Sequence, residues 1–78
     1  MAVLRLFASA REAAGTGRDE IDGPTVGTVL DEACRRYGTG FASVLEGCRV
    51  WCNGEPANID DAVGHDDEVA VLPPVSGG

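Results

Sequence analysis

Short runs of apolar residues, most of them alternating with polar ones, divide the chain into predicted strands around one longer amphipathic segment. Strands are expected at residues 2–8, 18–22, 48–53 and 69–72, with a short one after position 54. Asn53-Gly54 favours a tight hairpin turn, and Pro56 shortens the strand that returns from it because proline has no N–H for the ladder. The pattern therefore predicts about four to five short strands.

The clearest helix is expected between Thr25, a candidate N-cap, and Gly38, a candidate stop. Apolar residues recur there at helical spacing, at Val26, Val29, Leu30, Ala33 and Cys34. Two shorter helical segments are expected, one at 10–14 with Ser9 as its cap and one at 41–45.

The order of these elements predicts an α+β fold. A mixed sheet packed on one main helix is the β-grasp arrangement, a roll in which the first and last strands are neighbours. We expect one β-grasp domain at residues 1–72 and an extended, flexible C-terminal tail at 73–78, because Pro73-Pro74 ends the last strand.

Charge narrows the classes of partner. The chain has 78 residues, and its six basic residues, all Arg, stand against thirteen acidic ones, for a net charge of −7. That balance argues against nucleic acid and anionic membranes and fits a partner with a basic docking surface. No apolar run approaches the ~20 residues of a membrane span, so the expected location is the cytosol. Without any Lys, the chain offers no side-chain amine for an isopeptide bond.

The three cysteines do not form a recognisable framework. Cys34, Cys48 and Cys52 are odd in number, lack a CxxC pair, and have only His65 as a possible companion ligand. We expect reduced thiols that pack as small apolar residues, with no metal and no cofactor bound by this chain. His65 is expected to be a turn residue.

The last six residues carry the strongest functional pattern. Gly77 and Gly78 follow Pro73-Pro74 and a short spacer, and six extended residues reach at most about 20 Å. Residues without Cβ can thread a narrow channel, and a carboxylate becomes reactive as a mixed anhydride such as an acyl-adenylate. The alternative is that these residues are a frayed terminus with no function.

Motifs in one register along most of the chain resemble the MoaD/ThiS family of ubiquitin-like sulfur carriers, and most of all the small subunit of molybdopterin synthase. The matching segments are Phe7-Ala8, Arg11-Glu12, Ala14-Gly15, Thr25-Val26, Val50, Asn53-Gly54-Glu55, Asp67-Glu68-Val69-Ala70 and the terminal PPVSGG. The family usually has Asp-Gly before the last strand. Here His65-Asp66 stands there, so we expect either a left-handed Asp66 or a bend at Gly64.

The resemblance implies a chemistry centred on Gly78. A ubiquitin-activating-type enzyme would use ATP and Mg²⁺ to adenylate Gly78, and a cysteine desulfurase or rhodanese would supply sulfur for a thiocarboxylate. The large subunit of molybdopterin synthase, in a heterotetramer, would then use this sulfur to build the dithiolene of molybdopterin. Gly77 would allow threading, and the chain would be a sulfur donor rather than an enzyme by itself.

Strand parity predicts where such partners dock. Phe7, Trp51 and Leu72 would share the sheet face that points away from the helix, flanked by Arg5 and Arg49. The tail residues Pro73, Pro74, Val75 and Ser76 would complete the partner-binding set. Two alternatives remain: Phe7 could pack in the core, and the Trp51 ring could lie half-buried over the sheet.

Other functions share this fold and tail. The carrier could serve a thiazole, cysteine or a sulfur-bearing secondary metabolite instead of molybdopterin. It could also be a ubiquitin-like protein modifier, with Gly78 ending as an amide on a target lysine, or an interaction module whose tail is inert.

Overall fold

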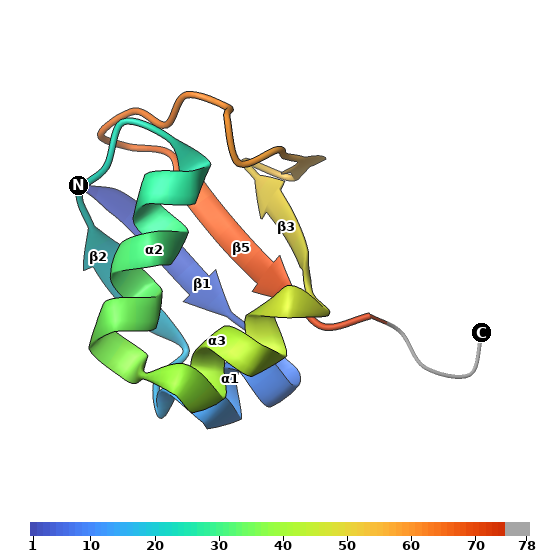
Figure 1. The fold of residues 1–78 in the computed structure, drawn as a ribbon. Coiled ribbons are helices and arrows are strands. Elements are labelled where there is room, and N and C mark those ends of the chain that lie inside the picture. The colour runs from blue at the N-terminus through green and yellow to red at the C-terminus, as the bar shows by residue number, and fades with distance from the viewer. Residues whose placement is uncertain (75–78) are drawn as a thin grey trace.

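Within residues 1–74, the chain forms a five-stranded mixed sheet with three helices (Figure 1). The computed structural model describes residues 1–74. The strands are β1 (Ala2–Leu6), β2 (Arg18–Ile21), β3 (Arg49–Cys52), β4 (Glu55–Pro56) and β5 (Glu68–Leu72). The helices are α1 (Ala8–Ala14), α2 (Val26–Tyr37) and α3 (Thr39–Glu46).

The sheet has the order β2-β1-β5-β3-β4, with the first and last strands parallel at its centre. β2 is antiparallel to β1 and forms one edge, while the β3–β4 hairpin forms the other. This topology confirms the β-grasp prediction. The short strands fall at the edges, where β4 accommodates Pro56 without breaking an interior ladder.

One face of the sheet is buried beneath α2, and this sandwich is the core (Figure 1). The alternation predicted from the sequence holds, since every second residue of the two central strands is buried and the others are more exposed. The largest fully buried side chains are Phe41, Leu4, Leu6, Ile21, Val26, Val29, Val69 and Val71. The opposite face of the sheet carries no helix in the described part of the chain.

The ends of α2 match the prediction. The Thr25 hydroxyl accepts a hydrogen bond from the Thr28 N–H, and Gly38, at φ +93°, donates its N–H to the Cys34 carbonyl. α3 then begins at Thr39, so it is longer than the expected 41–45 segment. Phe41 explains its placement, because this ring is fully buried and meets the Tyr37 ring edge-on at 5.2 Å.

The expected Ser9 cap on the first helix is wrong. α1 begins at Ala8, two residues before the expected start at position 10, and the flanking residue Phe7 makes no side-chain capping bond. The Phe7 carbonyl instead accepts hydrogen bonds from the N–H groups of Ala10 and Arg11, which leaves Ser9 inside the first turn. Gly15 ends the helix in the left-handed region, as the sequence indicated.

Polar side chains join the edge strand β2 to α2. Arg36 donates to the Asp19 carboxylate at 3.0 Å and to Glu32 at 3.1 Å, and the Tyr37 hydroxyl also donates to Asp19. Burial alone would raise the pKa of Asp19, but the hydrogen bonds from Tyr37, the Glu20 N–H and Arg36 together lower it. The network therefore favours an ionised Asp19 in the folded state.

The loop between β4 and β5 caps the start of α2. The Val26 N–H donates to the Asp61 carbonyl at 3.0 Å, and the Gly27 N–H donates to the Ile59 carbonyl at 2.8 Å. These two bonds satisfy N–H groups that have no partner within the helix. A Cβ on Gly27 would lie 3.1 Å from the Ile59 carbonyl oxygen, so glycine permits this close approach.

Replacing Gly27 with Ala should destabilise the fold by about 1 kcal/mol, because the collision with the Ile59 carbonyl outweighs the gain in helix propensity. Gly40→Ala is the matched control in α3, since a Cβ there meets nothing within 4 Å. Gly40→Ala should leave stability unchanged or raise it by about 0.5–1 kcal/mol. Urea unfolding measures the free energy of unfolding of both variants. Equal stabilisation of both would contradict the prediction, because it would mean that the loop at Ile59 moves away from the added Cβ at no cost.

Candidate functional site

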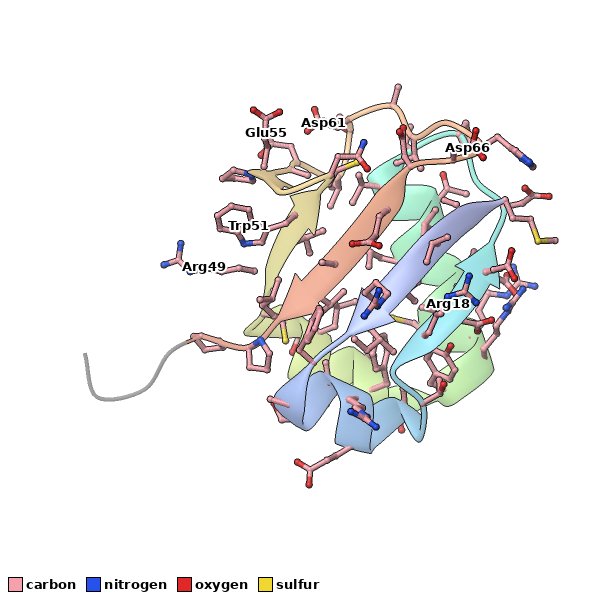
Figure 2. All side chains as sticks on the ribbon, turned by 180° about the vertical axis from the view of Figure 1, so that it is seen from behind. Arg18, Arg49, Trp51, Glu55, Asp61 and Asp66 are labelled. Atoms are coloured by element: carbon pink, nitrogen blue, oxygen red, sulfur yellow. The ribbon has the colours of Figure 1, made fainter. Side chains whose placement is uncertain are left out.

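The open face of the sheet carries one transverse row of side chains that crosses all five strands. The register sets Arg18 beside Arg5, then Ala70, then Trp51, then Pro56. Side chains in register on neighbouring strands point to the same face, and Figure 2 shows Arg18 and Trp51 on opposite sides of the two central strands. The face therefore changes from basic at the β2 edge to aromatic at the β3–β4 edge.

Phe7 and Leu72 lie one step beyond this row, where the two central strands end. Phe7 is 40% exposed, and the Arg5 guanidinium carbon lies 5.9 Å from the centre of its ring. This exposure excludes the core position considered for Phe7. Trp51 and Leu72 are half-buried. We call Phe7, Trp51, Ala70 and Leu72, with Arg5 and Arg49 at the rim, the open-face patch.

The patch continues into the start of the tail. A shallow hollow of about 380 Å³ is lined by Arg49, Trp51, Leu72, Pro73 and Pro74. Figure 2 shows Arg49 and Trp51 extending side by side from β3 beside this exit. The predicted site residues Val75, Ser76, Gly77 and Gly78 lie outside the described residues. The chain thus leaves the sheet next to the aromatic end of the open-face patch.

On the other side of Phe7, the predicted rim residue Arg5 is joined by Arg11 and Arg18, which the sequence had not singled out as docking residues. A hollow of about 400 Å³ is lined by Arg5, Leu6, Phe7, Arg11, Thr16, Gly17 and Arg18. Arg18 could have been inferred from strand parity, because it faces Arg5 across the β1–β2 pair. The nearest carboxylates are 3.7 Å from Arg5 and Arg18 and are exposed, so they neutralise these guanidinium groups only weakly.

The hairpin that carries Trp51 is fixed to β5 by Asn53. Its side-chain carbonyl accepts from the Glu68 N–H, its amide donates to the Asp67 carboxylate, and both contacts are 2.9 Å. Asn53 and Gly54 have φ of +52° and +83°, as the predicted hairpin turn requires. The Asn53-Gly54 motif therefore sets the position of the hairpin relative to the central strand.

The turn before β5 spans Gly64 to Asp67, and the left-handed Asp66 that was one of the two expectations is wrong. Among the described residues neither Asp66 nor Gly64 has a positive φ. The Asp67 carboxylate instead accepts from the Gly64 N–H at 2.7 Å, and the Asp67 N–H donates to the Gly64 carbonyl. The hydrogen bonds from Gly64 and then Asn53 lower the pKa of the Asp67 carboxyl. The Asp67 side chain thus closes this turn.

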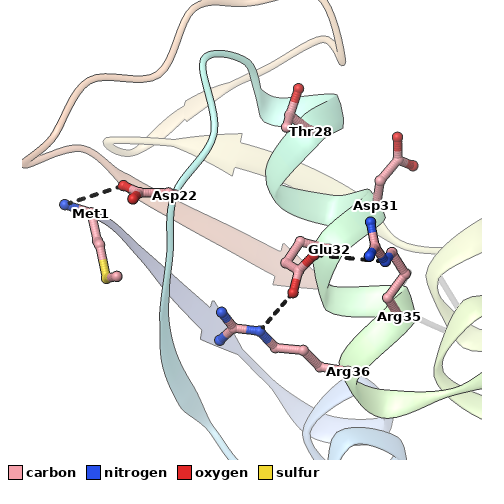
Figure 3. Close-up of a pocket in the computed structure, with 7 residues that line it drawn as sticks. All are labelled: Met1, Asp22, Thr28, Asp31, Glu32, Arg35 and Arg36. Carbon is pink, nitrogen blue, oxygen red and sulfur yellow. Dashed lines mark hydrogen bonds and ion pairs between the residues drawn. The ribbon is translucent and has the colours of Figure 1, made fainter.

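In a polar hollow on the helix side, most of the charged groups pair with one another (Figure 3). Arg35 and Arg36 both contact Glu32, and the N-terminal amine lies 3.8 Å from the Asp22 carboxylate. These pairs account for most of the charged groups that line the hollow. We therefore place the candidate functional site on the open-face patch.

All three cysteine thiols are free and half-buried, and burial raises the pKa of each. Within residues 1–74, no group of three or more His, Cys, Asp or Glu side chains is arranged to hold a metal ion. None of the helices in that range has the length and apolarity needed to cross a membrane.

Comparison with known proteins identifies the family. The model of the ThiS family matches residues 4–78, from the first strand through the terminal glycines. The chain belongs to the ThiS family. This confirms the resemblance inferred from the motifs and places the chain among ubiquitin-like sulfur carriers and modifiers, small proteins that are typically non-catalytic.

Individual relatives of this ThiS-family chain span nearly its whole length. Small archaeal modifier protein 1 of Haloferax volcanii is 38% identical over 85 residues, covering 95% of this chain and 97% of the relative. The solution structure of small archaeal modifier protein 1 from Methanosarcina acetivorans has a TM-score of 0.87 at 28% identity, covering 99% and 95% of the two chains.

A third ThiS-family neighbour shares the fold. The structure of the complex of subunits 1 and 2 of molybdopterin-converting factor from Helicobacter pylori matches with a TM-score of 0.73 at 20% identity. The match covers 99% of this chain and 97% of that one. At this identity the comparison establishes the β-grasp architecture and nothing finer.

Lowering the pH should weaken the turn that Asp67 closes. A carboxyl whose pKa is lower in the folded than in the unfolded state stabilises the fold above its unfolded pKa, and this contribution is lost as pH falls through the folded pKa. Asp67→Asn should therefore make unfolding less pH-dependent between pH 7 and pH 3. Urea unfolding across this range measures the difference, and parallel curves for both proteins would contradict it.

Proposed function

We propose that this chain is a sulfur carrier whose residue Gly78 is adenylated, converted to a thiocarboxylate and used as a sulfur donor by the large subunit of a molybdopterin synthase. The observation that carries the proposal is the continuity between the open-face patch and the tail. β5 is the central strand, and its last residue, Leu72, together with Pro73 and Pro74, lines the hollow beside Trp51. A partner that binds this patch is positioned to receive residues 75–78.

The composition of the patch supports docking of a protein. Aromatic and aliphatic side chains at its centre and arginine at its rim are typical of protein interfaces. The arginines that flank Phe7 favour a partner whose facing rim is acidic. This differs from the basic docking surface expected from net charge alone, because Arg5, Arg11 and Arg18 gather on one part of an otherwise acidic protein.

The assignment to molybdopterin rests on the terminal PPVSGG and the accompanying motifs. The Helicobacter pylori neighbour is a complex of subunits 1 and 2 of molybdopterin-converting factor, and we propose that this chain pairs with a large subunit in a heterotetramer. An ATP- and Mg²⁺-dependent adenylating enzyme and a cysteine desulfurase or rhodanese would prepare Gly78 in the cytoplasm. Delivery of the same sulfur to thiazole, cysteine or a secondary metabolite would use identical steps with a different final partner.

A second candidate is protein modification. It is favoured by the names of the relatives from Haloferax volcanii and Methanosarcina acetivorans, both small archaeal modifier proteins. In that function Gly78 would form an amide with a lysine of another protein, since this chain has none. Lysine adducts that end in the Gly77-Gly78 remnant, recovered from cells by mass spectrometry, would support modification. Free thiocarboxylate without such adducts would support the sulfur carrier.

The decisive experiment is the intact mass of the protein produced together with its host's adenylating enzyme and sulfur source. We expect a mass gain equal to the replacement of one oxygen by one sulfur. A chain that lacks only Gly78 is the matched control and should show no gain. If the wild type gains nothing while the same enzyme charges another carrier, the proposed function is wrong.

Docking can be tested with the adenylating enzyme. Trp51→Ala should weaken binding about 30-fold, roughly 2 kcal/mol, since an aromatic anchor in the middle of an interface carries much of the affinity. Arg49→Glu should slow association about tenfold at low salt. Arg35→Glu is the control with the same charge change on α2, where the side chain is 82% exposed away from the patch. Equal effects of both charge reversals would show that net charge rather than the patch governs docking.

A further inference from the structure

A second apolar surface lies on the helix side of the molecule. It is an open groove of about 510 Å³ between α2, α3, the start of β3 and the loop that precedes β5. The apolar and thiol side chains that line it are Leu30, Cys34, Ala42, Leu45, Cys48, Val50 and Ile59. Val50 and Trp51 are consecutive in β3 and point to opposite faces, so this groove is separate from the open-face patch.

Ile59 gives the groove a prearranged apolar contact. Its side chain is 64% exposed, more than that of any other large hydrophobic residue described. Its carbonyl accepts from the Gly27 N–H, while the Asp61 carboxylate accepts from the Asn58 N–H and the Asp61 N–H donates back to the Asn58 carbonyl. A partner that covers Ile59 therefore loses little loop entropy, because the loop is already ordered.

The charges at the groove are of one sign. Among residues 1–74, the charged side chains that line it are Asp31 and Glu46, both exposed, and neither makes an ion pair within that range. The two thiols are neutral, since burial and the Asp31 carboxylate raise the pKa of Cys34 and burial raises that of Cys48. An apolar floor between two carboxylates is complementary to an apolar stripe flanked by positive charge.

We propose that the groove between α2 and α3 is a second docking surface, which binds a basic amphipathic helix of a partner protein. The apolar stripe of that helix would cover Ile59 and Leu45, and its arginine or lysine side chains would meet Asp31 and Glu46. The two surfaces have opposite electrostatic preferences, because the open-face patch is rimmed by arginine. One carrier can thus hold two partners at once, on opposite sides of the sheet.

The groove does not depend on the sulfur chemistry of Gly78. Its lining ends at Ile59, before the last strand begins. A chain that ends at Pro74 should therefore bind the helix as well as the full chain does. Loss of binding in the shortened chain would assign the interaction to the tail and overturn the proposal, whatever the outcome of the mass experiment on Gly78.

The test locates the bound peptide by measuring how much it slows the alkylation of each cysteine. The probe is a synthetic peptide of about 18 residues with leucine on one helical face and arginine on the other. Bound peptide should slow alkylation of Cys34 and Cys48 by iodoacetamide about tenfold or more. Cys52 does not line the groove and is the internal control, with an expected change below about twofold.

Substitutions identify the contacts. Ile59→Arg and Glu46→Arg should each weaken binding about tenfold. Asp66→Arg is the control, since it makes the same reversal of charge at an exposed position in the turn before β5 and should leave the affinity within about twofold. Circular dichroism of each variant verifies its folding, and Glu46→Arg places a positive charge at the C-terminal end of α3, where it is tolerated.

Three results would overturn the proposal. If a scrambled peptide of the same composition binds equally well, the interaction depends on charge alone and not on an apolar helical face. Protection of Cys52 to the same degree would indicate general stabilisation of the fold. A change in the fluorescence of Trp51, the single tryptophan, without protection of Cys34 and Cys48 would place the peptide on the open face.

Discussion

The parallel pairing of β1 with β5 is the constraint on which the rest of the molecule depends. It joins residues more than sixty positions apart, from Val3 opposite Glu68 to Leu6 opposite Val71. Every other strand is added outward from this pair, and the side chains buried beneath α2 come largely from it. The pair also makes β1 and β5 end at the same edge, so Phe7 and the start of the tail become neighbours.

Burial on one side of this sheet leaves the other side free for recognition. The alternation that sends Leu4, Leu6, Val69 and Val71 into the core sends Arg5 and Ala70 to the open face by the same geometry. Stability and the proposed docking thus depend on alternate residues of the same strands. A shift of one residue in the register would exchange the two roles, which makes the register itself a functional property.

The sequence predicted what depends on periodicity and local chemistry. The strands, α2 with Thr25 and Gly38, the hairpin turn and the outward position of Phe7 could all be inferred. Errors occurred where tertiary contacts override local preference. Ser9 has the chemistry of a cap, but the helix begins before it and the Phe7 carbonyl accepts the first bonds. Asp67 closes its turn through a side-chain hydrogen bond, without a left-handed residue. The groove beside Ile59 joins α2, α3, β3 and a later loop, which are distant in sequence, so it required the structure.

The central place of β5 also gives the domain a mechanical property. A pull on the chain at Pro73 acts along the axis of β5, which is hydrogen-bonded to β1 on one side and to β3 on the other. These ladders are loaded in shear, so their bonds share the force and must give way together, whereas a strand pulled from an edge would open one bond at a time. The folded domain can therefore bear a pull applied at Pro73 without its strands separating one bond at a time.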